Sequence, residues 1–274
     1  MAKILRNLIF KGQVSLAVME TTELVNGAIA VHGTGAEASR LLGGLLTCGA
    51  YLASSLKEDT GSISLTVKAK DGDGAVSVSA DKDLHIRGYA DGTCEETLVG
   101  GTLTVVREDG FSRPFVGTCD IACDDVSDIL ARYFGQSEQI PTAVCIFTEI
   151  GEDGKCKGAG GVVMQLLPDA SDEAVEGATE LFESYRNYLG IYLGADAEEA
   201  YGKLFASVAE GDAEVLTPVY KCNCSESKIK GVLSAVGREE LLKICDEVGE
   251  VKVHCHYCNT DYTFDRTRIE EEFK

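Results

Sequence analysis

The sequence predicts an α+β protein in three parts: a core domain of mixed sheet and helix over residues 1–168, an acidic helical linker over 169–218 and a small zinc-binding domain over 219–274. Three observations lead to this prediction. Strand-like alternation fills much of the first part, the composition changes after Pro168, and two close cysteine pairs fall in the last part. A chain of 274 residues has room for these units, since domains usually span about 100–200 residues.

The first part opens with a strand and two helices. Residues 13–19 alternate between apolar and polar types, and "TTELVNGAIAVHG" then has helical spacing, with Thr22 as the expected cap. The next stretch, 35–57, combines leucines with small residues, among them Gly43 and Gly44. These small residues predict a buried helix that neighbouring elements approach closely.

The remainder of the first part is dominated by strands. From 61 to 120 the sequence has a period of two, interrupted by turn signals such as "DGDG" and "EDG", and this predicts an antiparallel sheet. Residues 124–134 have the pattern of one amphipathic helix. Two more strands, "TAVCIFTEI" and "GGVVMQLL", then complete the core domain before Pro168.

The linker combines a helical stripe with a strongly acidic composition. Between Pro168 and Pro218 there are twelve acidic and two basic residues. A helix of this composition, rich in tyrosine and glycine, is only weakly stable alone, so its order depends on what it packs against. Its apolar stripe consists of residues 175, 178, 181, 182, 185, 189, 192 and 193.

Charge and targeting signals narrow the function further. The net charge of −20 disfavours a general role in nucleic-acid binding. The first residues lack the pattern of a secretory signal, and the longest apolar stretch, 41–53, is shorter than the roughly 20 residues that span a bilayer. A cytoplasmic protein without membrane association is therefore expected, and close cysteine pairs in that reducing compartment indicate metal binding or redox chemistry.

Two pairs of cysteines predict a structural zinc site. Cys222 and Cys224 precede a helical stretch, and Cys255 and Cys258 lie at the turn of a predicted hairpin, where Asn259 suits a left-handed backbone. Four thiolates on two short loops match tetrahedral zinc. A short polar segment also needs a source of stability other than its own core, which disfavours unligated buried thiols.

Two histidines flank Cys255 and are alternative ligands. Imidazole also suits zinc, but four sulfurs already complete the tetrahedron, and on a strand His254 and His256 face away from Cys255.

The spacing of Cys222 and Cys224 adds a redox hypothesis. Two cysteines one residue apart can also close into a strained, labile disulfide. Oxidation of the four sulfurs would eject the metal and unfold the segment, which makes the site a candidate folding switch.

Several motifs together resemble the redox-regulated heat-shock chaperones of about thirty-three kilodaltons, a family of bacterial holdases with a C-terminal zinc switch. The resemblance covers nearly the whole chain. It rests on "TTELV", "SLK", "RGYA", "YFGQSEQIPT", "GGVVMQLLPDAS", "CNC", "CHYC" and "YTFD".

The resemblance implies an ATP-independent chaperone that is not an enzyme. In such proteins the reduced form holds one Zn²⁺ through four cysteines, here Cys222, Cys224, Cys255 and Cys258, and is inactive. Oxidative stress pairs Cys222 with Cys224 and Cys255 with Cys258, and the zinc is released. The zinc domain and the linker then unfold, and the protein, commonly as a homodimer, binds unfolding client proteins.

Further cysteines depart from this family pattern. They are interpreted as small buried residues, except that Cys119 and Cys123, four residues apart, are candidates for a secondary disulfide. The six considered are Cys48, Cys94, Cys119, Cys123, Cys145 and Cys156.

Two other classes of function remain as alternatives. A zinc ribbon that binds nucleic acid would use lysines of the last part, but the chain lacks a clear basic and aromatic stripe. A thiol-disulfide oxidoreductase would use Cys255 and Cys258, yet that chemistry usually places CxxC at a helix N-terminus rather than between two strands. No supported nucleophile and base are present, so no catalytic residues are predicted. The available lysines are Lys221, Lys228, Lys230 and Lys252.

Overall fold

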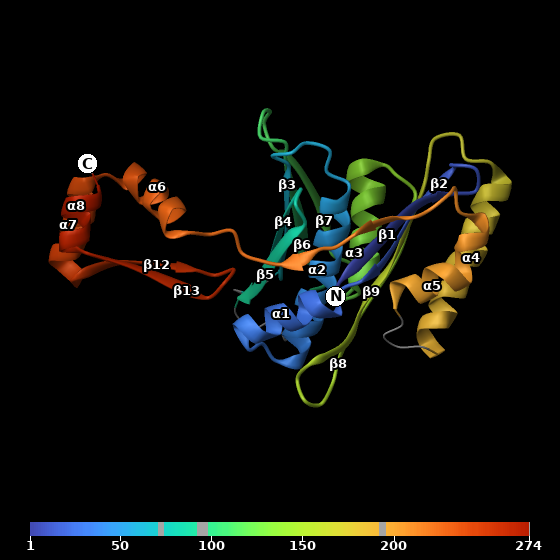
Figure 1. Ribbon diagram of the computed structural model, residues 1–274, viewed down its shortest axis with the longest axis horizontal. Coiled ribbons are helices and arrows are strands. Elements are labelled where there is room, and N and C mark those ends of the chain that lie inside the picture. The colour runs from blue at the N-terminus through green and yellow to red at the C-terminus, as the bar shows by residue number, and fades with distance from the viewer. Residues whose placement is uncertain (71–73, 92–97, 192–195, 274) are drawn as a thin grey trace. The chain divides into compact units, whose positions relative to one another are not determined.

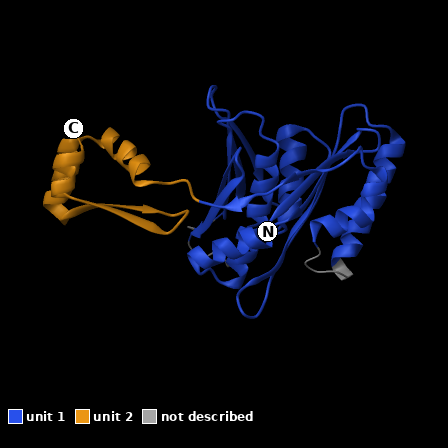
Figure 2. Cartoon of the chain, in the orientation of Figure 1, with its two compact units in different colours: residues 1–221 blue, residues 222–274 orange. Residues whose placement is uncertain are grey.

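A computed structural model describes residues 1–70, 74–91, 98–191 and 196–273, and it confirms the α+β fold class. The chain forms two compact units, residues 1–221 and 222–274 (Figure 2). The segment expected as a linker, 169–218, is part of the first unit, because its apolar side chains pack against a sheet there.

One sheet of the first unit joins strands from the start, the middle and the end of that unit (Figure 1). Its order is β10-β1-β2-β9-β8, and all neighbours are antiparallel. The expected strands β2, β8 and β9 are confirmed, whereas neither β1 nor β10 is predicted from the sequence. The strands are β1 (Lys3–Ile9), β2 (Val14–Glu20), β8 (Thr142–Ile150), β9 (Cys156–Leu166) and β10 (Glu214–Leu216).

The second sheet contains the predicted antiparallel region. Its order is β11-β5-β4-β3-β6-β7, so residues 61–120 supply five neighbouring antiparallel strands, as expected. The last strand of the unit, β11, is added at one edge in parallel to β5. The strands are β3 (Ser62–Lys68), β4 (Ala75–Asp81), β5 (His85–Asp91), β6 (Thr102–Glu108), β7 (Phe115–Asp120) and β11 (Val219–Tyr220).

The helix α1 (Thr22–His32) begins at the residue that was predicted as its cap. Thr22 is its first residue, and Thr21 takes the N-cap position without a side-chain hydrogen bond to the helix. The prediction of Thr22 as cap is therefore wrong. The hydroxyl of Thr22 instead accepts a hydrogen bond from the backbone N–H of Ala159 at 3.1 Å, which ties the helix start to β9.

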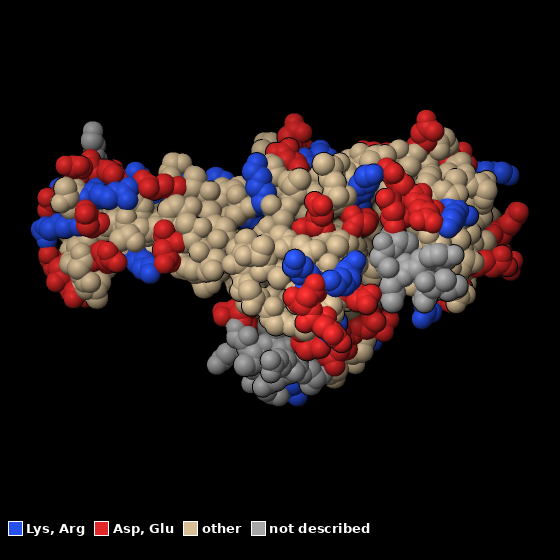
Figure 3. Space-filling model, turned by 60° about the horizontal axis from the view of Figure 1, so that its bottom comes forward, with Lys and Arg blue, Asp and Glu red and all other residues tan. Residues whose placement is uncertain are grey.

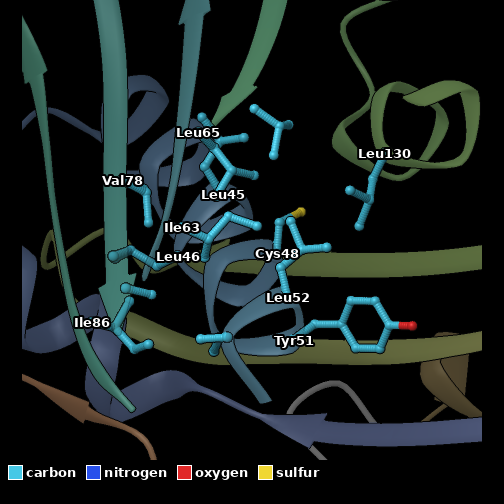
Figure 4. Close-up of a cluster of buried hydrophobic side chains, with 14 of the residues drawn as sticks. Leu45, Leu46, Cys48, Tyr51, Leu52, Ile63, Leu65, Val78, Ile86 and Leu130 are labelled. Carbon is cyan, nitrogen blue, oxygen red and sulfur yellow. The ribbon is translucent and has the colours of Figure 1, made fainter. Parts of the chain in front are cut away.

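The helix α2 (Ala36–Ser54) forms the centre of the first unit. It packs against strands of both sheets and against α1 and α3 (Val126–Tyr133), which continues as one π-helical turn, Phe134–Glu138. Figure 4 shows its leucines among side chains of the second sheet. A Cβ atom added at Gly43 would lie 2.7 Å from Thr148, and one at Gly49 would lie 2.7 Å from Val78. The predicted close approach of neighbours to this helix is thus confirmed.

The segment 169–218 covers the other face of the first sheet. Alternation along β2 directs Ala17 and Met19 to the core around α2, and Leu16 and Val18 to the opposite face. There α4 (Asp172–Ile191) and α5 (Ala197–Leu204) bury Tyr185, Leu189, Ala200 and other apolar side chains. The helical prediction is confirmed for the described residues, while Tyr192 and Leu193 of the predicted stripe lie outside them.

The second unit is small and has its own core. The predicted hairpin is present as β12 (Glu250–Cys255) and β13 (Thr260–Asp265). The predicted helical stretch before it is two helices, α6 (Glu226–Val236) and α7 (Arg238–Val248), because the chain breaks at Gly237 with φ 91°. A further helix, α8 (Arg266–Glu272), is not predicted from the sequence.

No helix of the described residues is long and apolar enough to cross a membrane.

Candidate metal centre

The second unit brings the four predicted cysteines together. Cys222 and Cys224 lie just before α6, Cys255 ends β12, and Cys258 lies in the hairpin turn. Their four Sγ atoms all lie within 4.8 Å of one another. The Cys222 and Cys255 sulfurs are 3.8 Å apart, and the Cys224 and Cys258 sulfurs are 3.2 Å apart.

Local backbone signals position both pairs. In the hairpin turn the N–H of Cys258 donates to the carbonyl of Cys255 at 3.3 Å, and Asn259 has φ 54°, the left-handed conformation expected from the sequence. Ser225 directly follows the other pair and caps α6, its hydroxyl accepting from the N–H of Lys228 at 3.3 Å. The turn and the cap fix the direction of the chain at each cysteine pair.

The sulfur positions fit a metal ion that takes four thiolates. Zinc bound at about 2.3 Å to each of four sulfurs in a tetrahedron separates those sulfurs by about 3.8 Å. The Cys222–Cys255 distance equals this value, and the Cys224–Cys258 distance is shorter by a fraction of an ångström. All four cysteines are half-buried, so an ion could reach them from solvent. The cluster could therefore hold a metal ion.

The two histidines beside Cys255 do not belong to this cluster. His254 lies on β12 with its Nδ1 atom 2.7 Å from the Asp261 carboxylate of the opposite strand. The rings of His254 and His256 contact each other edge to face, 5.0 Å between centroids. The ring contact agrees with the expectation that the two histidines point the same way, although β12 ends at Cys255 and His256 lies in the turn.

Cys222, Cys224 and Cys258 differ in their readiness to ionise. Burial opposes ionisation of Cys224, but hydrogen bonds with Tyr262 and with the other three cysteines lower its pKa to about 7. Burial raises the pKa of Cys222 to about 12 and also raises the pKa of Cys258. Of these three, Cys224 is thus the sulfur that the surrounding residues favour most as a thiolate.

Two hydroxyl groups at the cluster were not found from the sequence. The Tyr262 hydroxyl lies 3.1 Å from the Cys224 sulfur, and the Thr260 hydroxyl lies 3.3 Å from the Cys258 sulfur. Both residues belong to β13, where residues two apart face the same side. That period of two, counted from Cys258 through "CNTDYTF", was the available signal.

Three of the five further cysteines that lie in the described residues are buried, as expected. Cys48, Cys119 and Cys156 are buried, and burial raises the pKa of each thiol. Cys145 is half-buried, and desolvation raises its pKa to about 11. Cys123 is half-buried, with its sulfur 3.4 Å from the Asp128 carboxylate.

Cys119 and Cys123 are both free thiols here, so their disulfide remains a prediction. Cys94 lies outside the described residues. Cys245, which was not singled out from the sequence, is buried in the core of the second unit with its sulfur 3.9 Å from the Phe264 carbonyl oxygen.

A second group of potential ligands, Asp81, Asp83 and His85, lies in the first unit. One Asp81 oxygen accepts the backbone N–H groups of Asp83 and His85, and the other lies 3.3 Å from the His85 ring. The Lys221 ammonium is 3.3 Å from the remaining ring nitrogen of His85. A lysine already provides positive charge there, so the cysteine cluster is the stronger candidate.

The chain thus combines a two-sheet core unit with a small unit whose four clustered cysteines could hold a metal ion. The family model described as "Hsp33 protein" matches residues 3–265, and the chain belongs to this Hsp33 family.

Named relatives and a solved structure cover almost all of the chain. It is 29% identical over 282 residues to a 33 kDa chaperonin of Clostridium botulinum, covering 97% of this chain and 95% of that protein. It is 30% identical over 283 residues to a 33 kDa chaperonin of Clostridium perfringens, covering 97% and 90%. The crystal structure of a 33 kDa chaperonin, a heat shock protein 33 homologue of Thermotoga maritima, superposes with a TM-score of 0.84 at 26% identity, covering 98% of this chain and 96% of that one.

Proposed function

We propose that this protein is a redox-regulated, ATP-independent chaperone of the holdase type. In the reduced state Cys222, Cys224, Cys255 and Cys258 bind one Zn²⁺ and the protein is inactive. Oxidation forms disulfides within each pair, Cys222 with Cys224 and Cys255 with Cys258, and releases the zinc. The observation that carries the proposal is the clustering of four cysteine sulfurs within 4.8 Å in a unit with a very small apolar core.

Zinc supplies stability to the second unit and keeps its four sulfurs deprotonated and adjacent. Structural zinc contributes about 10–16 kcal/mol to the folding of such small modules at neutral pH. The residues of this chain then determine how far the sulfurs are exposed to an oxidant and how close they lie to one another. Each cysteine is half-buried and therefore open to a small oxidant, and all four sulfurs lie within 4.8 Å of one another.

We propose that the segment 169–218 is released when the second unit unfolds. The acidic helices α4 and α5 cover an apolar face of the first sheet, including Leu16, Val18 and Val162. Unfolding of the second unit would remove a folded neighbour from the chain end of this segment, and its detachment would expose that face. An exposed apolar sheet face is a suitable surface for unfolded client proteins.

We propose a homodimer in the active state and a cytoplasmic location, where thiols are kept reduced until stress. Nucleic acid and membranes are not proposed as partners. Figure 3 supports the exclusion of nucleic acid. Acidic side chains predominate over basic ones on the face shown, and its described residues form no continuous basic patch.

The decisive experiment measures zinc content and client protection together across an oxidant titration. The protein is purified with reductant, treated with increasing hydrogen peroxide at a heat-shock temperature, and mixed with a client that aggregates on dilution from denaturant. Zinc release and suppression of aggregation should rise together. Equal protection by the reduced and the oxidised protein would contradict the proposal.

The same samples distinguish the alternatives. Tight, salt-sensitive binding of DNA or RNA by the reduced form would favour a zinc ribbon. Multiple turnover with glutathione would favour a thiol-disulfide oxidoreductase that uses Cys255 and Cys258.

A further inference from the structure

Strand β13 presents one hydroxyl to each cysteine pair. Tyr262 reaches Cys224 of the first pair, with its oxygen 3.1 Å from the sulfur. Thr260 reaches Cys258 of the second pair, at 3.3 Å. The two hydroxyls come from the same face of one strand, yet their hydrogen-bonding roles differ.

The Thr260 hydroxyl donates its hydrogen bond to a backbone carbonyl rather than to the sulfur. It donates to the carbonyl oxygen of Cys258 at 3.2 Å, so it turns a lone pair toward the Cys258 sulfur, and that thiol is the donor. When Cys258 is a thiolate, as a metal ligand must be, it has no proton to give. The Thr260 hydroxyl can then donate to this sulfur only by turning its proton away from the Cys258 carbonyl.

The Tyr262 hydroxyl is placed to donate a hydrogen bond to the Cys224 sulfur. Once Cys224 is a thiolate it can only accept, so the phenolic O–H must be the donor across the 3.1 Å contact. The phenol is held firmly, because Tyr262 is paired with Val253 on β12 and packs against the core of the second unit. Donors to metal-bound ligands orient them and tune their reactivity.

We propose that Tyr262 is a positioning residue of the redox switch: its hydroxyl donates to the Cys224 thiolate, holds that sulfur in the cluster, and slows closure of the Cys222–Cys224 disulfide. This inference rests on the proposed function. It gives the Cys222–Cys224 pair a higher threshold for oxidation than the pair would have without the Tyr262 donor.

The oxidant in this step is a hydroperoxide, and the chemistry balances. One thiolate of the pair attacks a peroxide oxygen, which breaks the O–O bond, gives a sulfenic acid and releases hydroxide or alkoxide. The second thiolate attacks that sulfur, forms the S–S bond and releases hydroxide. Two electrons pass from the sulfurs to the peroxide, and the two sulfurs would no longer be available to hold a metal ion.

A hydrogen bond to a thiolate withdraws charge from sulfur and so lowers its nucleophilicity. Thiolate nucleophilicity follows basicity with a slope of about 0.4–0.5, and a hydrogen bond to a charged group is worth about 1.5–3 kcal/mol. Removing the Tyr262 donor should therefore accelerate oxidation of its pair by about fivefold.

The test compares full-length, zinc-loaded wild type with Tyr262→Phe and Thr260→Val. Zinc release after addition of hydrogen peroxide is followed with a chromogenic chelator, and thiols are trapped at intervals for mass spectrometry of each pair. Tyr262→Phe keeps the ring and should oxidise the Cys222–Cys224 pair about fivefold faster. Thr260→Val removes the other hydroxyl and should leave the rate of that pair within twofold of wild type.

The outcomes separate this inference from the proposed function. Equal rates at Cys222–Cys224 in wild type and Tyr262→Phe, with zinc release still following oxidation, would overturn the role of Tyr262 alone. A wild type that binds no zinc, or keeps it after oxidation, would overturn the proposed function. Tyr262→Leu provides a second side chain without a hydroxyl should the phenylalanine variant not load zinc, and the same acceleration is expected.

Discussion

The two units of this protein are stabilised in different ways. The first unit surrounds the buried helix α2 with apolar side chains from two sheets, and a second apolar cluster lies under α4 and α5. The core of the second unit, within the described residues, is limited to Leu233, Leu241, Cys245, Val251, Phe264, Ile269 and Phe273. Below about 70–80 residues a single core rarely suffices, so a unit of this size needs a metal or disulfides.

Ion pairs of the second unit do not replace that missing core. Arg268 pairs with Glu226 and Glu272, and Lys230 pairs with the same two carboxylates. All four side chains are partly exposed, and exposed pairs typically contribute about 0–1 kcal/mol each. Burial of apolar side chains holds the first unit, whereas the second unit has a small core beside four clustered cysteines, so we expect its stability to depend on the proposed metal site.

Removal of the metal tests this comparison with the largest expected effect. A strong chelator added under reducing conditions should unfold residues 222–274 and leave the core around α2 folded, because only the second unit depends on the site. Hydrogen exchange measured by mass spectrometry should show loss of protection in α7 and β13 and unchanged protection in α2. Full protection of both units after chelation would contradict the comparison.

Truncation of the first core should have the next largest effect. Leu46 has no exposed surface and lies between α2 and the second sheet (Figure 4), so Leu46→Ala should reduce the free energy of unfolding of the first unit by about 2–5 kcal/mol. Urea unfolding monitored by circular dichroism measures this change. Val232→Ala, at a position 68% exposed on α6, should change stability by less than about 0.5 kcal/mol and is the control. A loss below about 1 kcal/mol at Leu46 would mean that the core is loosely packed.

Two glycines of the acidic segment provide a matched pair of smaller effects. A Cβ atom at Gly177 in α4 would lie 2.7 Å from the ring of Phe10, whereas one at Gly202 in α5 would meet no atom within 4 Å. Alanine is favoured over glycine in a helix by about 1 kcal/mol, so Gly202→Ala should stabilise α5 by up to that amount. Gly177→Ala should instead destabilise the contact with the β1–β2 turn, by about 1–2 kcal/mol.

Hydrogen exchange of α4 and α5 in the reduced protein measures both changes. Faster exchange in Gly177→Ala and slower exchange in Gly202→Ala are expected. The same direction of change in both variants would show that Phe10 does not hold α4 against the sheet.

The smallest expected effect concerns a helix cap in the second unit. The Asp265 carboxylate accepts a hydrogen bond from the N–H of Arg268 at 2.8 Å and caps α8. Asp265→Ala should reduce the stability of the zinc-loaded unit by about 1 kcal/mol. A lower melting temperature of this unit is expected, with Glu271→Ala, an exposed acidic residue of the same helix, as the control. Equal melting temperatures for the two variants would exclude a capping role.

The sequence by itself determined the features that depend on local spacing. The four candidate ligands could be found because the cysteines of each pair lie within three or four consecutive residues. They therefore stay close together whatever the rest of the chain does. The five strands between 61 and 120 could be predicted because consecutive antiparallel strands are joined by short turns with clear residue signals. The apolar stripe of α4 was visible for the same reason, since helical periodicity is a local property.

Only the tertiary structure decided which distant segments meet. Strands β10 and β11 are too short to show a period of two, and they are defined by pairing with β1 and β5, about two hundred and one hundred thirty residues earlier in the chain. The break at Gly237 depends on a left-handed backbone angle that a glycine permits but does not require. The contact of Tyr262 with Cys224 likewise arises because hairpin pairing and core packing orient β13 toward a loop thirty-eight residues away. Local spacing specifies which residues can act together, while long-range packing decides which of them do.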